Sequence, residues 1–441
     1  MAAVEIIAID YFVNFLSTQN MTIVSFKHRW VVLFLLVTMV LPIAAIKVKS
    51  QSPLALNPPA QTVPASLFGM HIHDALKNWP NVPFSQWRLW DAGVAWGDLE
   101  PQPGAWKFEL LDRYVDIATK QKVKILLTLG QTPRWASARP NDESPYGNPG
   151  WPAEPANLKD WRNYVRTVAT RYRGKIRAYE VWNEPDLKSF YSGSVEQMVV
   201  LAKEAHTILK QVDPQISVLS PGGTDGTPDF QWQRDYFRRG GGKYADAISQ
   251  HFYPKSAAPE DLSKYISQMR AVMAEFGLAQ PLWNTEAGWL KPGEIAPERQ
   301  AMAYVARTYL INWASGVQRF YWYAWDNQTA VSLHLTKIDG KTLIPVTNVT
   351  NSYTQIQKWL VGAKMHKCGA NSTKTWICNL TRKGQPFWIV WNPDRELTFT
   401  VPKNWQVRTS RDLYGKDQTL PDSHQISIDF MPVLLSATKL R

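Results

Sequence analysis

The chain is poor in cysteine, in long runs of one charge and in repeats. Its 441 residues include only two cysteines, so no more than one disulfide can form within it. The net charge is +12, yet no run of five or six basic residues occurs and no nucleic-acid motif accompanies the charge. These absences argue against nucleic-acid binding and favour a globular protein with a solvated basic surface. Attraction to acidic glycans or to anionic lipid headgroups stays open.

Tryptophan, by contrast, is abundant. The chain has 21 Trp, 17 Tyr and 16 Phe. A buried indole N–H needs a hydrogen-bond partner, so an excess of Trp suggests rings that line a cleft and offer both a flat apolar face and a polar edge. Sugars present the matching C–H faces and hydroxyl groups. Packing in a large core accounts for many of the same rings.

Residues 30–46 form an apolar stretch that only Thr38 and Pro42 interrupt, with basic residues on both sides. At a rise of about 1.5 Å per residue, it just reaches across a hydrocarbon core of roughly 30 Å. The stretch fits either a cleaved signal peptide or a membrane anchor, and the lack of a good small-residue cleavage site favours the anchor. We therefore expect a periplasmic protein held at the inner membrane through residues 30–46, or a secreted one if the segment is cleaved.

The two cysteines, Cys368 and Cys378, have a spacing that suits neighbouring strands of a hairpin. A disulfide between them would require an oxidising compartment, in agreement with export. The alternative is a pair of inert buried thiols.

Strand-like and helix-like segments alternate after a Pro-rich linker at residues 52–64, which is typical of a parallel α/β fold. Eight strands in about 260 residues match a (β/α)₈ TIM barrel. From residue 364 short alternating runs follow instead, which predict a small antiparallel β-sandwich. The expected domains are a signal or anchor segment at 1–50, a catalytic barrel at 51–362 and a β-sandwich at 363–441. The predicted barrel strands are 67–71, 86–90, 124–129, 175–182, 217–220, 247–252, 281–286 and 319–325.

Two of these strands end in a carboxylate. The fourth leads into Asn183-Glu184-Pro185, and the seventh ends in Asn284-Thr285-Glu286. In a TIM barrel the C-terminal ends of the strands build the active site. Glycoside hydrolysis needs two carboxyl groups on either side of the scissile bond, so Glu184 and Glu286 are the candidate catalytic pair. A structural salt bridge is the alternative role for each, and Glu180, on the same strand face as Glu184, is an alternative titrating partner.

The segment 182–185 resembles the acid/base motif of clan A retaining glycoside hydrolases, and 284–286 resembles their nucleophile strand. The similarity is greatest to glycoside hydrolase family 39 and covers roughly residues 65–330. Within that family the chain is most similar to membrane-anchored bacterial endoglycosidases that cut the exopolysaccharide of biofilms. Further motifs that carry the resemblance are Arg88-Leu89-Trp90-Asp91, Trp96 with Leu99-Glu100-Pro101, and Gln131-Thr132-Pro133-Arg134-Trp135.

The resemblance implies an acid/base role for Glu184 and a nucleophilic role for Glu286, without a cofactor or a metal. Burial beside Trp182 and the second carboxylate should raise the pKa of Glu184, so that it is protonated before attack. Asn183 should bind the sugar 2-OH, unless it only forms the turn before Pro185.

Three more residues are expected around the nucleophile. Arg88 should keep Glu286 ionised through a charge-assisted bond, or else pair with another acid in the barrel core. Alternation places His251 and Tyr253 on one strand face, with Tyr253 donating to Glu286 and His251 helping to position it. A histidine satisfied within the core is the competing interpretation of His251.

Further candidates for sugar binding are His71 and the tryptophans at strand ends. His71 and His73 share a face, but no third ligand has a spacing that would support zinc. Hydrogen bonding to substrate or neighbours is therefore favoured for His71. Trp90, Trp135 and Trp325 are candidate sugar platforms, with core packing equally open for each.

The leading hypothesis is a retaining endo-acting β-glycosidase whose substrate is an exopolysaccharide. Its expected partners are that polysaccharide, the inner membrane and, as a further option, the exopolysaccharide synthesis machinery. One alternative is an exo-acting enzyme similar to the β-xylosidases of family 39, which would need a closed pocket rather than an open groove. Another is a membrane-tethered polysaccharide-binding protein without catalysis.

Overall fold

The computed structural model describes residues 54–224, 228–254, 258–289, 296–326, 333–339 and 341–438. The apolar stretch at 30–46 lies outside these residues, so the expected anchor stays a prediction. Within the described residues, every helix is too short or too polar to span a bilayer.

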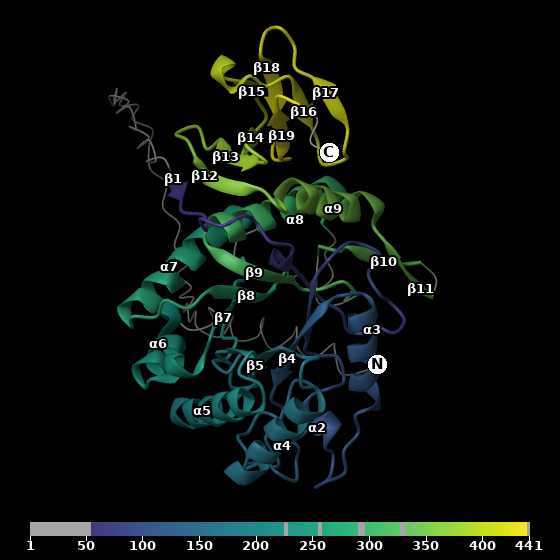
Figure 1. The fold of residues 1–441 in the computed structure, drawn as a ribbon, viewed down its shortest axis with the longest axis vertical. Helices are drawn as coiled ribbons and strands as arrows, with labels where there is room; N and C mark the ends of the chain where they lie inside the picture. Colours follow the sequence, from purple (N-terminus) through teal and green to yellow (C-terminus); the bar gives the residue numbers. More distant parts are fainter. Residues whose placement is uncertain are drawn as a thin grey trace, which may run out of the picture.

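Eight parallel strands form a barrel (Figure 1), as the alternation predicted. The strand order is β6-β5-β4-β3-β2-β9-β8-β7, and the parallel bridges Leu219–Ala247 and Gly223–Gln250 close the sheet between β6 and β7. Strands β2, β3, β5, β7 and β8 are buried at every position, because helices cover the outside and side chains fill the inside. The strands are β2 (Phe68–His71), β3 (Gln86–Leu89), β4 (Lys124–Leu129), β5 (Ala178–Val181), β6 (Ser217–Leu219), β7 (Ile248–His251), β8 (Leu282–Ala287) and β9 (Val317–Trp322).

The helices lie between the barrel strands, as the alternation of helix-like and strand-like segments predicted. Their starts have local causes: Ser194 and Gln197 form a capping box before α5, and Asn157 caps α4. One short helix, α2 (Trp96–Leu99), was not expected from the sequence. The others are α3 (Glu109–Lys120), α4 (Leu158–Arg171), α5 (Val195–Val212), α6 (Gln231–Arg238), α7 (Leu262–Glu275), α8 (Glu298–Ala314) and α9 (Thr347–Leu360).

The C-terminal part consists of antiparallel sheets, as predicted. A seven-stranded sheet has the order β1-β12-β13-β14-β19-β16-β17, and β15 pairs with β18 in a second, two-stranded sheet. A small core that includes Trp388, Val390 and Ile428 draws on strands of both sheets. The strands are β12 (Lys364–Ala370), β13 (Trp376–Arg382), β14 (Gln385–Trp391), β15 (Leu397–Thr400), β16 (Thr409–Arg411), β17 (Asp417–Thr419), β18 (Gln425–Ile428) and β19 (Val433–Ser436).

Two segments differ from the expectation. The sequence predicts that β1 (Leu54–Leu56) belongs to a linker, but this strand pairs with β12 at the edge of the C-terminal sheet. Its partner strand comes more than 300 residues later, so no local pattern could show the pairing. A hairpin of β10 (Thr336–Asp339) and β11 (Thr342–Pro345) also precedes α9.

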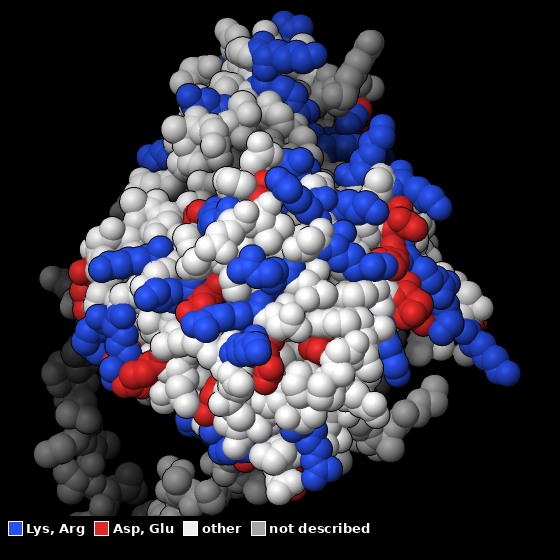
Figure 2. Space-filling model, turned by 60° about the horizontal axis from the view of Figure 1, so that its bottom comes forward, with Lys and Arg blue, Asp and Glu red and all other residues white. Residues whose placement is uncertain are grey.

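The cysteines lie opposite each other on β12 and β13 and form a disulfide. This agrees with the hairpin inferred from their spacing. Figure 2 shows Lys and Arg spread over one face among acidic and uncharged residues, as expected of a solvated basic surface.

The barrel and the C-terminal sheet meet at a buried ion pair. Arg307 of α8 is 1% exposed, and its guanidinium binds Glu260 through two hydrogen bonds, one of them Nε to Oε1 at 2.8 Å. Trp391 of β14 donates its indole N–H to the same Glu260 oxygen at 2.8 Å. Glu260 thus links a barrel helix to the C-terminal sheet, and Figure 1 shows α8 and α9 beneath that sheet.

We expect Arg307→Ala to destabilise the protein by about 3–5 kcal/mol, because it leaves the Glu260 carboxylate without its charged partner in a mostly buried site. Arg299→Ala is the matched control. It removes an exposed pair with Asp429 and should change stability by less than about 1 kcal/mol. Urea unfolding followed by Trp fluorescence measures both, and equal losses would contradict the role assigned to Glu260.

Candidate active site

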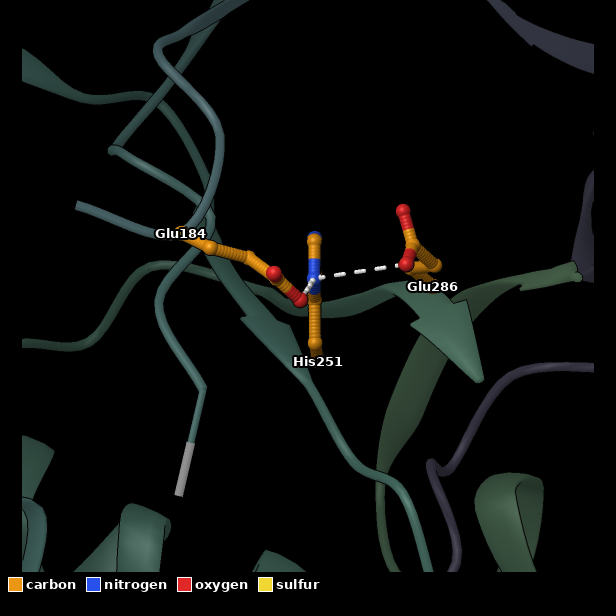
Figure 3. A group of neighbouring side chains, drawn as sticks. All are labelled: Glu184, His251 and Glu286. Carbon is orange, nitrogen blue, oxygen red and sulfur yellow. Dashed lines mark hydrogen bonds and ion pairs between the residues drawn. The ribbon is translucent and has the colours of Figure 1, made fainter. Parts of the chain in front are cut away.

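The two candidate carboxylates meet at the mouth of the barrel. Glu286 is in β8, and Glu184 follows the end of β5. One carboxylate oxygen of Glu184, one ring nitrogen of His251 and one carboxylate oxygen of Glu286 all lie within 4.8 Å of one another. Figure 3 shows the His251 ring between the two carboxyl groups, in contact with both.

The backbone at the neighbouring strand ends is unusual. Asp91 after β3, Gln131 after β4, and Trp182 and Glu184 after β5 have φ values of 57°, 61°, 68° and 45°. Left-handed backbone is unfavourable for residues other than glycine and occurs where surrounding structure holds it, often at active sites. The N–H of Glu184 donates to the Gly222 carbonyl at 2.7 Å, which helps to hold that turn.

Gly222 itself allows the close packing beneath the site. A Cβ there would lie 2.7 Å from Glu180 Oε1 and 2.8 Å from His251 Nε2. Both distances are shorter than the contacts that a Cβ atom makes in proteins. A larger residue at position 222 would therefore displace the groups that support Glu184.

Arg88 joins three strand ends. Its fully buried guanidinium donates to Glu286 Oε2 at 2.7 Å, to Glu180 Oε2 at 2.7 Å and to Asn183 Oδ1 at 2.6 Å. The sequence predicted the bond between Arg88 and Glu286. Arg88 also pairs with Glu180, so the alternative prediction, an ion pair with another acid in the barrel core, is correct as well.

Glu180 is a supporting carboxylate rather than the titrating partner. Burial acts to raise its pKa, but the charge of Arg88 and hydrogen bonds from neighbours outweigh burial and lower it. Thr128 and Ser249 donate their hydroxyls to it at 2.9 Å and 2.5 Å.

The environments of the two candidate catalytic carboxyls differ. Burial, and then the nearby Asp186, raises the pKa of Glu184 to about 8. Burial also raises the pKa of Glu286, but Arg88 and the Tyr253 hydroxyl, which donates at 2.7 Å, act in the opposite direction. Glu184 is therefore suited to hold a proton and Glu286 to be the ionised member of the pair.

Tyr253 makes the expected contact with Glu286. His251 contacts the other carboxyl, Glu184, as well as Glu286. His251 Nδ1 bonds Glu184 Oε1 at 2.9 Å and lies 3.9 Å from Glu286 Oε1. Strand β7 ends at His251, and its register against β8 shifts between Gln250 and His251. His251 and Tyr253 nevertheless both reach Glu286, as the alternation predicted.

His71 and Asn183 are oriented by neighbours. His71 is fully buried, with Nε2 3.1 Å from the Thr285 carbonyl and 3.9 Å from Glu286 Oε2. Asn183 is 1% exposed, and its Oδ1 accepts from Arg88, which leaves its NH₂ group as the donor for a ligand.

The three tryptophans that were predicted as sugar platforms are less exposed to solvent than expected. Trp325 is only 3% exposed and packs in the main core, because β9 ends at Trp322 and the strand alternation does not reach position 325. Trp135 is half-buried and donates its indole N–H to the Glu100 carbonyl at 2.9 Å. Trp90 is 5% exposed and lines a small pocket together with Tyr146, Trp151 and Phe190.

Several site residues were missed in the sequence. Asp186 accepts from the Thr224 N–H and hydroxyl, and its place two residues after Glu184 was a usable signal. His73 was considered only as a zinc ligand, but its Nδ1 bonds Asp326 Oδ1 at 2.9 Å. Among the residues that the structure describes, Glu184, His251 and Glu286 are the His, Cys, Asp or Glu side chains whose potential metal-ligand atoms come together in one place.

A parallel eight-stranded barrel whose mouth holds two buried carboxyls, with the pKa of Glu184 raised to about 8, has the groups that glycoside hydrolysis requires. Residues 87–287, which include both carboxylates, match the model of Glycosyl hydrolases family 39. This supports the resemblance drawn from the motifs at the level of the family.

Known relatives agree with this class. A β-xylosidase of Geobacillus stearothermophilus is 24% identical over 185 residues, which cover 39% of this chain and 35% of that protein. An endo-1,4-β-xylanase A of Caldicellulosiruptor sp. (strain Rt8B.4) is 31% identical over 90 residues, covering 20% of this chain and 13% of that protein. The chain thus spans about a third or less of the length of these curated relatives.

Solved structures share the fold. A family 39 glycoside hydrolase from Bacteroides cellulosilyticus WH2 superposes with a TM-score of 0.67 at 17% identity, over 85% of this chain and 81% of that one. A GH39 β-xylosidase from Caulobacter crescentus gives 0.59 at 14% identity, over 87% and 97%.

The raised pKa of Glu184 predicts an alkaline limit to activity. Because the acid must carry a proton, kcat/KM should fall about tenfold per pH unit above about 8. Asp186→Asn removes a neighbouring negative charge, so it should lower the pKa of Glu184 and move this limit to lower pH. A pH profile of kcat/KM tests both statements, and an unmoved limit in Asp186→Asn would contradict the assignment of Glu184 as the acid.

Proposed function

We propose that the chain is a retaining, endo-acting β-glycosidase that cleaves an exopolysaccharide, with Glu184 as acid/base and Glu286 as nucleophile. The observation that carries the proposal is the approach of the two carboxyl groups, whose nearest oxygens lie within 4.8 Å. Retaining enzymes place the two groups about 5–5.5 Å apart, whereas inverting enzymes leave about 6.5–9.5 Å for a water molecule.

In the first step Glu286 attacks the anomeric carbon while Glu184 donates its proton to the leaving oxygen. The Glu286 carboxylate becomes an ester, so its negative charge beside Glu184 disappears. The pKa of Glu184 then falls, and Glu184 takes a proton from the water that hydrolyses the glycosyl-enzyme. Arg88 and Tyr253 hold Glu286 in place throughout.

The polymeric substrate rests on the resemblance to exopolysaccharide endoglycosidases. On this proposal residues 30–46 hold the enzyme at the inner membrane on the periplasmic side, where a growing exopolysaccharide and its synthesis machinery would be within reach. An exo-acting β-xylosidase is the second candidate, because two of the relatives are named as β-xylosidases.

Glu184→Gln should reduce kcat on an unactivated polysaccharide by about 10²–10⁴-fold, since it removes the general acid but keeps the shape of the side chain. The wild-type enzyme should first release the β-anomer of the new reducing end, as observed by ¹H NMR at early times. Thr119→Val, on the outer helix α3, is a control that should leave the rate unchanged. Initial release of the α-anomer would rule out a retaining mechanism.

The product ladder separates endo-action from exo-action. Bacterial exopolysaccharides and β-1,4-xylan are digested with the wild-type enzyme and with Glu184→Gln, and products are resolved by size. Endo-action predicts oligosaccharides of several lengths at early times. Release of xylose alone would favour the β-xylosidase alternative, and binding without any new reducing ends would favour a non-catalytic binding protein.

A further inference from the structure

A short segment after β6, residues 222–224, supports the candidate acid through its backbone. The Gly222 carbonyl accepts a hydrogen bond from the Glu184 N–H at 2.7 Å. The next carbonyl, that of Gly223, accepts from the His251 N–H at 2.8 Å. His251 in turn bonds the Glu184 carboxyl through Nδ1 at 2.9 Å (Figure 3). The same stretch of backbone therefore fixes both Glu184 and the ring that bonds its carboxyl.

Thr224 extends this support to a second carboxyl group. Its backbone N–H and its hydroxyl donate to the two carboxylate oxygens of Asp186 at 2.9 Å and 2.6 Å. Burial raises the pKa of Asp186, and these two bonds act in the opposite direction because they favour the charged carboxylate. The charge of Asp186 in turn favours the protonated form of Glu184. Thr224 thus fixes the place of an anion that acts on the candidate acid.

The segment itself is held by Gln233 of α6, one of the helices outside the barrel strands (Figure 1). Gln233 is 3% exposed, and its Nε2 donates to the Thr224 carbonyl at 2.6 Å and to Gln250 Oε1 at 3.3 Å. The amide lies directly against Gly223, since a Cβ at that position would be 2.4 Å from Gln233 Nε2. Because Gln250 belongs to β7, Gln233 ties the segment after β6 to the neighbouring strand.

The backbone of Glu184 needs such a restraint. Its φ of 45° lies in the left-handed region, which is unfavourable for residues other than glycine and persists only where the surrounding structure holds it. A displacement of about 1 Å in a reacting group can cost about 100-fold in rate. The nucleophile Glu286 is held by different groups, Arg88 and Tyr253. Loosening of residues 222–224 should therefore impair proton transfer by Glu184 more than attack by Glu286.

We propose that Gln233 and Thr224 are positioning residues for the acid, which hold Glu184 through the segment 222–224 in the geometry that proton transfer to the leaving group requires. This inference rests on the proposed glycosidase function and concerns one half of its chemistry, the transfer of a proton by Glu184. It gives a buried glutamine on an outer helix a part in the reaction.

The test compares two leaving groups. Phenyl β-xyloside and β-glucoside need a proton on the departing oxygen, whereas the 2,4-dinitrophenyl glycosides of the same sugars release a stable anion without one. Gln233→Met keeps the approximate size of the side chain and removes both amide hydrogen bonds. It should reduce kcat/KM on the phenyl glycosides by about 10- to 100-fold, but on the 2,4-dinitrophenyl glycosides by less than about twofold. Thr224→Val removes the hydroxyl bond to Asp186 and should show the same selectivity with a smaller loss.

Gln280→Met serves as the control. Gln280 also donates to backbone carbonyls, those of Gly242 and Ala245, but it lies near the starts of β7 and β8, at the end of the barrel opposite the mouth. Its loss should leave kcat/KM on both kinds of glycoside within about twofold of wild type. In Glu184→Gln, which has no acid to position, Gln233→Met should lower kcat/KM on the phenyl glycosides by less than about twofold.

Equal losses with both leaving groups would mean that Gln233 only supports the fold, and would overturn this inference alone. A loss in Glu184→Gln as large as in wild type, or no loss in either positioning variant, would do the same. If Gln233→Met does not fold by circular dichroism, Thr224→Val decides. If the enzyme accepts only longer glycans, the two leaving groups are placed on the shortest oligosaccharide that it releases. Failure of the wild-type enzyme to cleave any glycoside or polysaccharide would instead contradict the glycosidase proposal itself.

Discussion

The site is organised around one buried cation. Arg88 is fully buried, and its three donor groups reach Glu180 and Asn183 near the end of β5 and Glu286 on β8. A buried guanidinium is tolerated only when charged partners compensate its lost hydration. The strands that carry these partners are therefore held in one relative position, which is also the position that brings Glu184 and Glu286 together. The barrel geometry and the catalytic geometry depend on the same ion pairs.

A division of roles between the two carboxyls follows from this arrangement. Both are buried, so burial disfavours the charged form of each. Only Glu286 receives hydrogen bonds from Arg88 and Tyr253, whereas Glu184 faces the negative charge of Asp186 and bonds His251. One group is thereby favoured as a nucleophile and the other as a proton donor, although both are glutamates at the ends of barrel strands.

The C-terminal sheets support the barrel from one side rather than completing the site. Glu260 binds Arg307 of the barrel and Trp391 of the sheet, and β1 ties the segment before the barrel to one edge of that sheet. The chain thus enters the barrel from the C-terminal unit and returns to it after α9. We expect the two units to stabilise each other through these contacts.

The sequence alone determined the alternation of eight strands and the barrel helices, because side-chain periodicity is a local property. It also placed Glu184, Glu286, Arg88 and Tyr253 at strand ends, where a parallel barrel gathers them. Only the tertiary structure decided how close the two carboxyls are, that His251 bonds Glu184 and that Trp325 lies in the core. Those outcomes depend on strand register and on the path of the loops beyond each strand.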